Sequence, residues 1–261
     1  MSVVEGLLLD IDGVFTVSWE ALPGAISTFR WLRSQGPPFR MITNTTTDTR
    51  ADLAAKLARA GLDVAPEEIV TAVVATAGYL RAHHHGARVL LLSDGDARAD
   101  LEEVNLVDER PDVVLLGGAY EGFSYATVNR VFRMLMDGAE LIAMHRNLYW
   151  RTTDGWQLDS GAYIAGLEEA TGRRAVVCGK PAAAYFESAL ATIGVEPSHA
   201  AMVGDDVASD VVAAQSIGMT GVLVRTGKFR PEDLLGAPGW PDHAIDSVAE
   251  LPELLRTICE H

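Results

Sequence analysis

The stretch of sequence that decides the fold is GLLLDIDG, residues 6–13. Its apolar run does not alternate with polar residues, which is typical of a strand buried on both faces of a parallel sheet. Asp10 and Asp12 stand where this strand ends, and the carboxyl ends of strands are where open α/β sheets bind ligands. Gly13 favours a sharp turn after them. The stretch therefore predicts a buried strand followed by a ligand-binding acidic loop, with a plain acidic turn as the alternative.

Short apolar runs alternate with amphipathic stretches along the 261-residue chain. This pattern is typical of βαβ units and predicts an α/β fold with a Rossmann-like, doubly wound parallel sheet. The expected strands lie at residues 6–11, 39–42, 88–92, 113–116, 141–144, 175–178, 200–203, 220–224 and 244–245. The expected helices lie at residues 23–34, 48–60, 66–83, 96–104, 124–136, 161–170, 182–193, 208–217 and 248–259.

The loops with reactive side chains lie toward the two ends of the chain and not in its middle. The middle segment, residues 80–177, is long enough to form a domain of its own. We therefore expect a discontinuous core of residues 1–79 and 178–261, with an inserted α/β domain at residues 80–177.

The chain is strongly acidic, with 36 Asp and Glu against 21 Lys and Arg and a net charge of −15. Such a surface repels phosphodiester backbones and anionic lipids, so we expect neither a nucleic-acid polymer nor a membrane as partner. The longest apolar runs are too short to cross a bilayer, and we expect no signal peptide because a basic leading region is missing. Together with a cysteine content of two, Cys178 and Cys259, these features predict a cytoplasmic protein.

A second acidic loop, GDDVASD at residues 204–210, also follows an apolar strand. Its three carboxylates would repel Asp10 and Asp12 if the two loops met, so their convergence requires a cation. Oxygen ligands without histidine or cysteine favour Mg²⁺. The alternative is an N-capped helix in which Asp205 or Asp206 complements the helix dipole.

Two further loops carry groups suited to phosphate. The run TNTTT, residues 43–47, follows the strand at 39–42, and its hydroxyls, amide and backbone N–H groups near a helix start suit an anion. Gly179-Lys180-Pro181 places a lysine at a strand–helix junction, from which it could reach over the strand ends. The alternatives are a helix-capping threonine and a solvated lysine.

The order of these four loops resembles the four motifs of the haloacid dehalogenase (HAD) superfamily, with matches at Asp10 and Asp12, Thr43, Lys180, and Asp205 and Asp210. The loop at 43–47, the long insert after it and the Gly-Lys-Pro junction resemble the NagD-like subfamily IIA, whose inserted α/β cap is of the C2 type. Segments 141–143, 161–162 and 167–172 are similar to that cap and its exit. Two departures are Val14, where threonine is commoner, and the run MHRN at 144–147, where many relatives have Thr-Asn-Pro-Asp. The second departure weakens any transfer of substrate identity.

The resemblance implies a Mg²⁺-dependent phosphatase that hydrolyses a small phosphorylated metabolite through an aspartyl-phosphate. In this scheme Asp10 attacks phosphorus, and Asp12 protonates the leaving oxygen and later deprotonates water. Asp10, the main-chain carbonyl of Asp12, and Asp205 would hold Mg²⁺. Lys180 would neutralise the charge that develops on the nucleophile and on the phosphoryl oxygens.

The same resemblance assigns supporting roles. Thr43 and Asn44, with Lys180, would hold the phosphoryl group, and Asp210 would orient metal-bound water or Lys180. Asp206 would be an outer partner of the metal site or a helix cap. The candidate cap contacts with the leaving group are His145, Arg146 and Asn147, for which an ordinary exposed loop is the alternative. Homodimerisation through the cap is expected by analogy with the subfamily.

Three other functions share parts of this pattern. A phosphomutase or phosphotransferase would use all four motifs, and a regulatory module with little turnover could bind phosphate with them. Dehalogenation is disfavoured, because dehalogenases lack the acid–base residue that Asp12 supplies.

The pair Gly227-Lys228 is similar to the end of a P-loop, but its spacing from Gly221 is one residue too long and Phe229 replaces Ser or Thr. No role is therefore expected for this pair.

Overall fold

The computed structural model describes residues 4–118, 120–152, 155–236 and 239–259. The chain forms two compact units. The first unit comprises Met1–Thr43, Ala51–Val70 and Pro181–His261, and the second unit comprises Asn44–Arg50 and Thr71–Lys180. Among the described helices, none combines the length and apolarity that crossing a bilayer demands.

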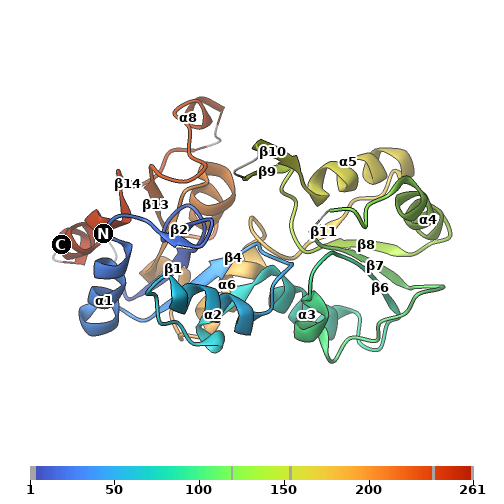
Figure 1. The fold of residues 1–261 in the computed structure, drawn as a ribbon, viewed down its shortest axis with the longest axis horizontal. Coiled ribbons are helices and arrows are strands. Elements are labelled where there is room, and N and C mark those ends of the chain that lie inside the picture. Colours follow the sequence, from blue (N-terminus) through green and yellow to red (C-terminus); the bar gives the residue numbers. More distant parts are fainter. Residues whose placement is uncertain (1–3, 119, 153–154, 237–238, 260–261) are drawn as a thin grey trace. The chain divides into compact units, whose positions relative to one another are not determined.

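A six-stranded sheet in the order β14-β13-β12-β1-β4-β5 forms the centre of the first unit (Figure 1). Its strands are β1 (Gly6–Asp10), β4 (Phe39–Thr43), β5 (Ile69–Thr71), β12 (Ala200–Gly204), β13 (Thr220–Val224) and β14 (His243–Ile245). β1 pairs in parallel with β12 on one side and with β4 on the other. The chain order reverses at β1, and such a reversal is where open α/β sheets place their ligands.

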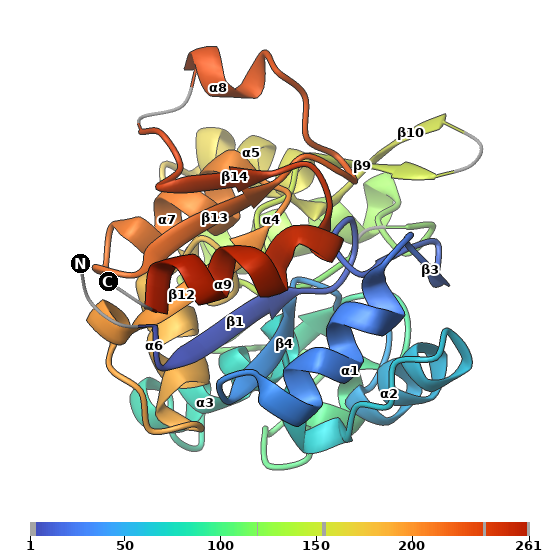
Figure 2. The ribbon, with the colours of Figure 1, turned by 90° about the vertical axis from the view of Figure 1, so that its left-hand side faces the viewer.

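Helices cover both faces of this sheet. They are α1 (Ala25–Gln35), α2 (Arg50–Arg59), α6 (Ala183–Ala191), α7 (Ala213–Gln215) and α9 (Leu251–Cys259). A further short helix, α8 (Asp233–Gly236), has no buried residue. Figure 2 shows α1 and α9 on the same side of the sheet, where Phe29 and Leu255 pack with Leu7 and Leu9 of β1. A short hairpin, β2 (Thr16–Val17) with β3 (Glu20–Ala21), follows β1.

The second unit contains a smaller parallel sheet in the order β11-β8-β7-β6. Its elements are α3 (Ala72–His83), β6 (Val89–Leu92), β7 (Val113–Leu116), α4 (Tyr125–Met136), β8 (Glu140–Ala143), the hairpin of β9 (Tyr149–Thr152) with β10 (Gly155–Leu158), α5 (Ser160–Thr171) and β11 (Val176–Val177). Helix α3 packs on one face of β7 through Val73 and Leu80. Helices α4 and α5 pack on the other face through residues such as Val131 and Ile164.

Several elements differ from the sequence-based expectation. The helix expected at 66–83 is a short turn, Pro66–Glu68, then strand β5, and only then helix α3. The residues of β5 are Ile, Val and Thr, whose branched side chains favour a strand. The helix expected at 96–104 is a short 3₁₀ turn, Ala97–Leu101. The helix expected at 208–217 begins as a wide π turn, Val207–Val212, before α7.

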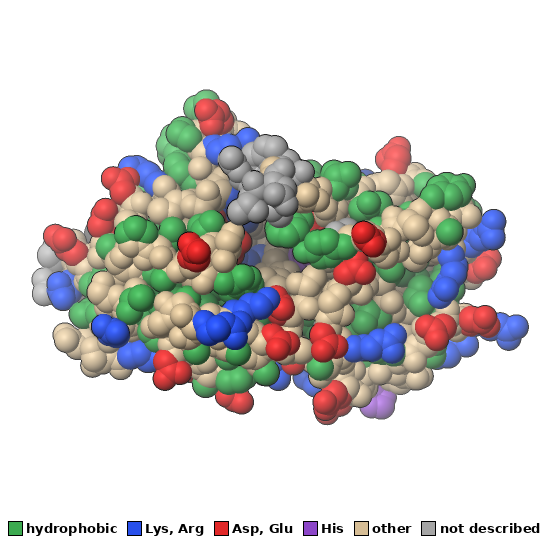
Figure 3. Space-filling model, viewed as in Figure 1, with side chains coloured by type: hydrophobic (Ala, Val, Ile, Leu, Met, Phe, Trp, Pro, Cys, Tyr) green, Lys and Arg blue, Asp and Glu red, His purple; other side chains and the backbone are tan. Residues whose placement is uncertain are grey.

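Charged side chains of both signs are interspersed over the face of the molecule shown in Figure 3. The excess negative charge therefore does not gather into one continuous patch on that face. Three acidic residues, Asp10, Asp205 and Asp210, are instead buried at the carboxyl edge of the first unit's sheet.

Candidate active site

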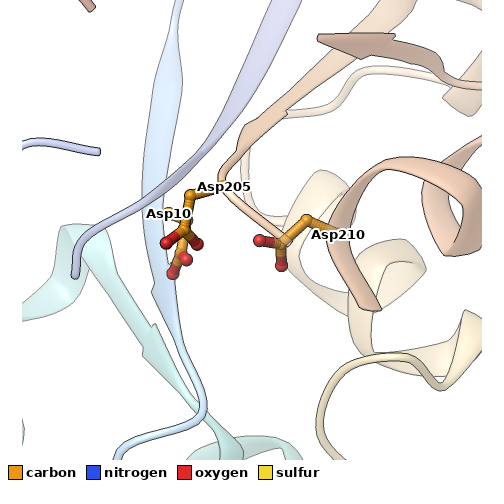
Figure 4. A group of neighbouring side chains, drawn as sticks. All are labelled: Asp10, Asp205 and Asp210. Atoms are coloured by element: carbon orange, nitrogen blue, oxygen red, sulfur yellow. The ribbon is translucent and has the colours of Figure 1, made fainter. Parts of the chain in front are cut away.

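Three buried carboxylates come together at the carboxyl edge of the six-stranded sheet. Asp10 is the last residue of β1, Asp205 directly follows β12, and Asp210 lies on the π turn after it. One oxygen from each carboxylate lies within 4.8 Å of those of the other two (Figure 4). Their exposed fractions are 5%, 2% and 0%. The parallel pairing of β1 with β12 therefore brings together two loops that are far apart in the sequence.

The three aspartates of residues 204–210 have different hydrogen-bond partners. Asp206 caps the π turn, because its Oδ1 accepts the N–H groups of Ala208 at 2.9 Å and Ser209 at 2.8 Å. Asp210 turns back, and its Oδ2 accepts the N–H of Asp206 at 3.2 Å. Gly204 leaves room for this return, since a Cβ at that position would overlap the Asp210 carboxylate. Asp205 is thereby left beside Asp10.

The carboxylate of Asp205 is incompletely satisfied within the protein. Its Oδ2 accepts the backbone N–H of Lys228 at 2.7 Å, but its buried Oδ1 has no hydrogen-bond partner among the described residues. Burial, together with the neighbouring Asp10 and Asp210, raises the pKa of Asp205 well above its usual range. A donor set of buried carboxylate oxygens with one oxygen unsatisfied fits a hard divalent cation such as Mg²⁺.

Two glycines allow the backbone to approach Asp205 closely. Gly13 has a φ of +88° and Gly227 a φ of +60°, and a Cβ on either would clash with Asp205 Oδ2. The hydroxyl of Thr226 donates to the carbonyl of Gly13 at 2.5 Å, which ties the two loops together. Asp205 is therefore enclosed by the loop after β1 and the loop after β13.

Lys228 is a residue of this site that the sequence analysis missed. Its Nζ lies 3.0 Å from Asp206 Oδ2. Burial would lower the pKa of Lys228, but Asp206 and Asp205 outweigh that effect and raise it. Burial would likewise raise the pKa of Asp206, but Lys228 and the N–H of Ser209 bring it below its usual range. The signal that could have found Lys228 is its position just after β13, a neighbour of β12 in the sheet.

Asp12 follows β1 and Thr43 is the last residue of β4, so both lie at the carboxyl edge of the same sheet. Asp12 is exposed, and the turn after it is held by the N–H of Gly13, which donates to the carbonyl of Thr16 at 2.7 Å. Thr43 is buried at the end of β4, and its N–H donates to the hydroxyl of Tyr185 at 3.1 Å. That hydroxyl also lies 3.0 Å from the Thr43 carbonyl, so Tyr185 fixes the backbone at Thr43. The sequence analysis gave no role to Tyr185.

Asn44 and Lys180 meet within the second unit. The backbone N–H of Lys180 donates to Asn44 Oδ1 at 2.9 Å, and the Asn44 amide donates to the Lys180 carbonyl at 3.0 Å. Gly179 makes this possible, because a Cβ there would crowd Asn44 and the carbonyl of Met144. Two residues expected to serve the phosphoryl group are thus held to each other, although 136 positions separate them in sequence.

The three candidate cap contacts have different surroundings. His145 is buried, with Nε2 3.8 Å from Asp159 Oδ1, and its Nδ1 accepts the N–H of Asn147 at 3.3 Å. Both terminal nitrogens of Arg146 donate to the buried carboxylate of Glu168, one of them at 2.8 Å. This bidentate bond raises the pKa of Arg146. Contact of these residues with a leaving group stays a prediction.

Comparisons with known proteins cover nearly the whole chain. The family model described as "Haloacid dehalogenase-like hydrolase" matches residues 7–107, and one described as "HAD-hyrolase-like" matches residues 177–251. The human "Haloacid dehalogenase-like hydrolase domain-containing protein 2" is 36% identical over 255 residues, covering 95% of this chain and 96% of the relative. The rat "Phospholysine phosphohistidine inorganic pyrophosphate phosphatase" is 37% identical over 261 residues, covering 98% of this chain and 95% of the relative.

Solved structures extend the likeness to the whole fold. The p-nitrophenyl phosphatase from Archaeoglobus fulgidus matches with a TM-score of 0.89 and 27% identity, over 97% of this chain and 99% of that one. NagD from E. coli K-12 matches with a TM-score of 0.85 and 27% identity, over 95% of this chain and 98% of that one. These matches confirm the predicted fold class, a parallel α/β sheet architecture.

Proposed function

Since the chain belongs to the haloacid dehalogenase-like hydrolases, we propose that it is a Mg²⁺-dependent phosphatase of small phosphomonoesters that works through an aspartyl-phosphate at Asp10. The likeness to NagD and to p-nitrophenyl phosphatases confirms the predicted NagD-like membership, and the matched hydrolases confirm a phosphohydrolase enzyme. The observation that carries the proposal is the buried cluster of Asp10, Asp205 and Asp210 at the carboxyl edge of the sheet.

The proposed metal ligands are Asp10, the main-chain carbonyl of Asp12, and Asp205, with Asp210 beside them. When bound there, Mg²⁺ supplies positive charge that offsets the repulsion between the Asp10 carboxylate and an anionic phosphoryl group. The unsatisfied Oδ1 of Asp205 and the raised pKa of that carboxyl support a cation at this place. Because Asp206 is already engaged by Lys228 and the capped turn, we assign it an outer, supporting position.

The covalent step begins at Asp10, whose Oδ1 accepts the N–H of Ile11 at 3.0 Å. An Asp10 carboxylate oxygen forms a bond to phosphorus, and the bond from phosphorus to the leaving oxygen breaks. Asp12 gives that oxygen a proton. A water molecule then attacks the phosphorus, Asp12 takes a proton from it, and the bond from Asp10 to phosphorus breaks. General acid–base help of this kind is typically about 10²–10⁴-fold.

The phosphoryl group would be held by Thr43, Asn44 and Lys180. The Tyr185 hydroxyl fixes the Thr43 backbone. Two hydrogen bonds between Asn44 and Lys180 hold these two residues to each other. Donors whose backbone is fixed by hydrogen bonds within their own unit reorganise little when charge develops, which favours catalysis. In this scheme the Lys180 ammonium would offset charge on the phosphoryl oxygens, and Asp210 would orient a water molecule at the metal site or Lys180.

The remaining parts of the proposal concern the rest of the chain. Residues 1–79 and 178–261 would form the catalytic core, and residues 80–177 a C2-type cap that selects the leaving group through His145, Arg146 and Asn147. Because Glu168 holds the Arg146 guanidinium, an anionic leaving group would have to share it with that carboxylate. A cytoplasmic location and a homodimer formed through the cap complete the proposal.

The test uses p-nitrophenyl phosphate, the substrate class that the name of one solved relative gives. Replacing Asp10→Asn keeps the shape of the side chain but removes the nucleophile, so Mg²⁺-dependent release of p-nitrophenolate should fall at least about 10³-fold. Asp246→Asn, at an exposed ion pair with Arg225, is the matched control and should keep wild-type turnover. Circular dichroism checks that both variants fold. Turnover that survives in Asp10→Asn contradicts the proposal.

A further inference from the structure

Lys228 lies beside the cluster of Asp10, Asp205 and Asp210, because its ammonium pairs with Asp206, the neighbour of Asp205 in sequence. It does not belong to the four motifs. We propose that Lys228 is the resident counter-ion of this cluster, and that its ammonium limits how tightly the cluster binds a divalent cation. The inference rests on the proposed function to the extent that Mg²⁺ is taken as the cation. It adds a residue that tunes the metal site from the loop after β13.

The contacts of Lys228 reach two aspartates at once. Its ammonium pairs with Asp206 at 3.0 Å, and its backbone N–H donates to Asp205 Oδ2 at 2.7 Å. The side chain is 47% exposed, so it lies at the rim of the cluster, and the Asp206 side chain is 28% exposed. One residue thus contacts a proposed metal ligand and its acidic neighbour in sequence.

The side chain of Lys228 contributes a positive charge, but it is not needed to hold the neighbouring carboxylates in position. Asp206 stays anchored without it, because the N–H groups of Ala208 and Ser209 hold its Oδ1. Asp205 also keeps its bond to this loop, because that bond comes from the main chain of Lys228. Removing the ammonium should therefore leave the carboxylates in place and change only the electrostatic potential around them.

The direction of the effect follows from Coulomb's law. A positive charge beside Asp206 reduces the mutual repulsion of the aspartates in the metal-free protein. The same charge repels an arriving divalent cation, so it lowers the affinity of the site for Mg²⁺. Because the pair is partly exposed, the effect is screened by salt and is moderate in size.

The experiment measures Mg²⁺ binding by isothermal titration calorimetry, with the metal alone and no substrate. Lys228→Met and Lys228→Gln should bind Mg²⁺ about threefold to tenfold more tightly than the wild type at low ionic strength, and the difference should shrink as KCl is added. Using two neutral variants protects the test if one of them folds poorly. Lys228→Arg restores the charge and should return the affinity to near the wild-type value.

Arg225→Met is the matched control. Arg225 lies in the same loop, its side chain is 49% exposed, and it forms an ion pair with Asp246 at 2.9 Å. The Arg225→Met change therefore also removes one positive charge, but one that pairs with Asp246 and not with the aspartates beside Lys228. This variant should bind Mg²⁺ as the wild type does. A second readout is the thermal midpoint without metal, which Lys228→Met should lower and added Mg²⁺ should raise by more than in the wild type.

The outcomes separate this inference from the proposed function. Unchanged or weaker Mg²⁺ binding in both neutral variants, while Asp205→Asn abolishes binding, overturns the role of Lys228 alone. A wild-type protein that neither binds Mg²⁺ nor hydrolyses p-nitrophenyl phosphate overturns the proposed function as well. Tighter binding that does not respond to salt also contradicts the inference, because an electrostatic cause requires screening.

Discussion

Asp205 in the first unit and Glu168 in the second are both buried carboxylates, with 2% and 4% of their surface exposed. Glu168 is fully engaged: both its oxygens accept from Arg146, one also accepts the N–H of Ala175 at 2.8 Å, and Arg174 lies within 3.4 Å. Asp205 accepts one backbone N–H and keeps a buried oxygen without a partner among the described residues. The same chemical group is thus satisfied in one unit and left incomplete in the other.

The pKa shifts of the two groups run in opposite directions. Hydrogen bonds from Arg146 bring the pKa of Glu168 below its usual range despite burial. Burial beside Asp10 and Asp210 raises the pKa of Asp205. A buried carboxylate with a complete set of hydrogen-bond partners is stabilised by the protein itself. A buried carboxylate without them requires a bound ligand or cation to offset the cost of its burial. From this comparison we infer a structural role for Glu168, and the incomplete partners of Asp205 support the cation site proposed above.

The largest effect should come from Asp205→Asn. Loss of a proposed metal ligand should lower Mg²⁺-dependent hydrolysis of p-nitrophenyl phosphate about 10³-fold, because the charge that offsets nucleophile–phosphate repulsion is lost. The rate is followed by absorbance over a Mg²⁺ titration. Asp112→Asn, at an exposed ion pair with Arg88, serves as the control and should match the wild type. Equal rates in the two variants would remove Asp205 from the site.

Glu168→Gln should instead damage stability and leave chemistry nearly intact. The neutral amide cannot replace the charged bonds to Arg146, so we expect the free energy of unfolding to fall by about 2 kcal/mol. Urea unfolding measures this value. Glu169→Gln, at the exposed neighbouring position, should change it by less than about 0.5 kcal/mol. If both variants unfold alike, Glu168 has no special structural role.

Asp205→Asn should have the opposite effect on stability when metal is absent. Removing one of three crowded carboxylates relieves repulsion, so the metal-free variant should be about 1 kcal/mol more stable than the metal-free wild type. The measurement is urea unfolding in the presence of a chelator. A loss of stability would show that Asp205 belongs with Glu168 as a structural carboxylate, and the comparison would fail.

A pH series gives the smallest effect. Because the pKa of Glu168 is lowered by folding, its contribution is fully present above its unfolded pKa, about 4.3, and is lost as the pH falls through the lower folded value. The free energy of unfolding of the wild type should therefore fall on acidification below about pH 4, by about 1 kcal/mol more than that of Glu168→Gln. Parallel slopes in the two proteins would contradict the assignment.

Much of the core sheet and of the acidic cluster was predictable from the sequence. Each acidic loop directly follows a short apolar run, and parallel pairing brings the carboxyl ends of such runs to one edge. The structure places Asp10 beside Asp205 and Asp210 accordingly. Strand β5 was missed because Pro-Glu-Glu at residues 66–68 is also a typical helix start, and it is in fact a short turn before a strand.

The contacts that depend on tertiary neighbours were not predictable. Lys228 acquires its role only because β13 lies next to β12, and the sequence pattern around it suggested a failed P-loop. The partner of Arg146 lies 22 residues away on helix α5, at a glutamate with no motif around it. The sequence alone indicates only a core aromatic residue at Tyr185, and its role follows from the hydrogen bond of its hydroxyl with the Thr43 backbone.

The most direct measurement of the central claim is to trap the phosphorylated aspartate. Asp12→Asn lacks the base for the second step, whereas p-nitrophenolate is a good leaving group that needs little protonation in the first. Asp12→Asn incubated with p-nitrophenyl phosphate and Mg²⁺, quenched in acid and digested, should give a phosphorylated peptide that carries Asp10, seen by mass spectrometry. The double variant Asp10→Asn, Asp12→Asn should give none. A phosphoryl group found on another residue, or product formed with no phosphopeptide at all, would contradict the account.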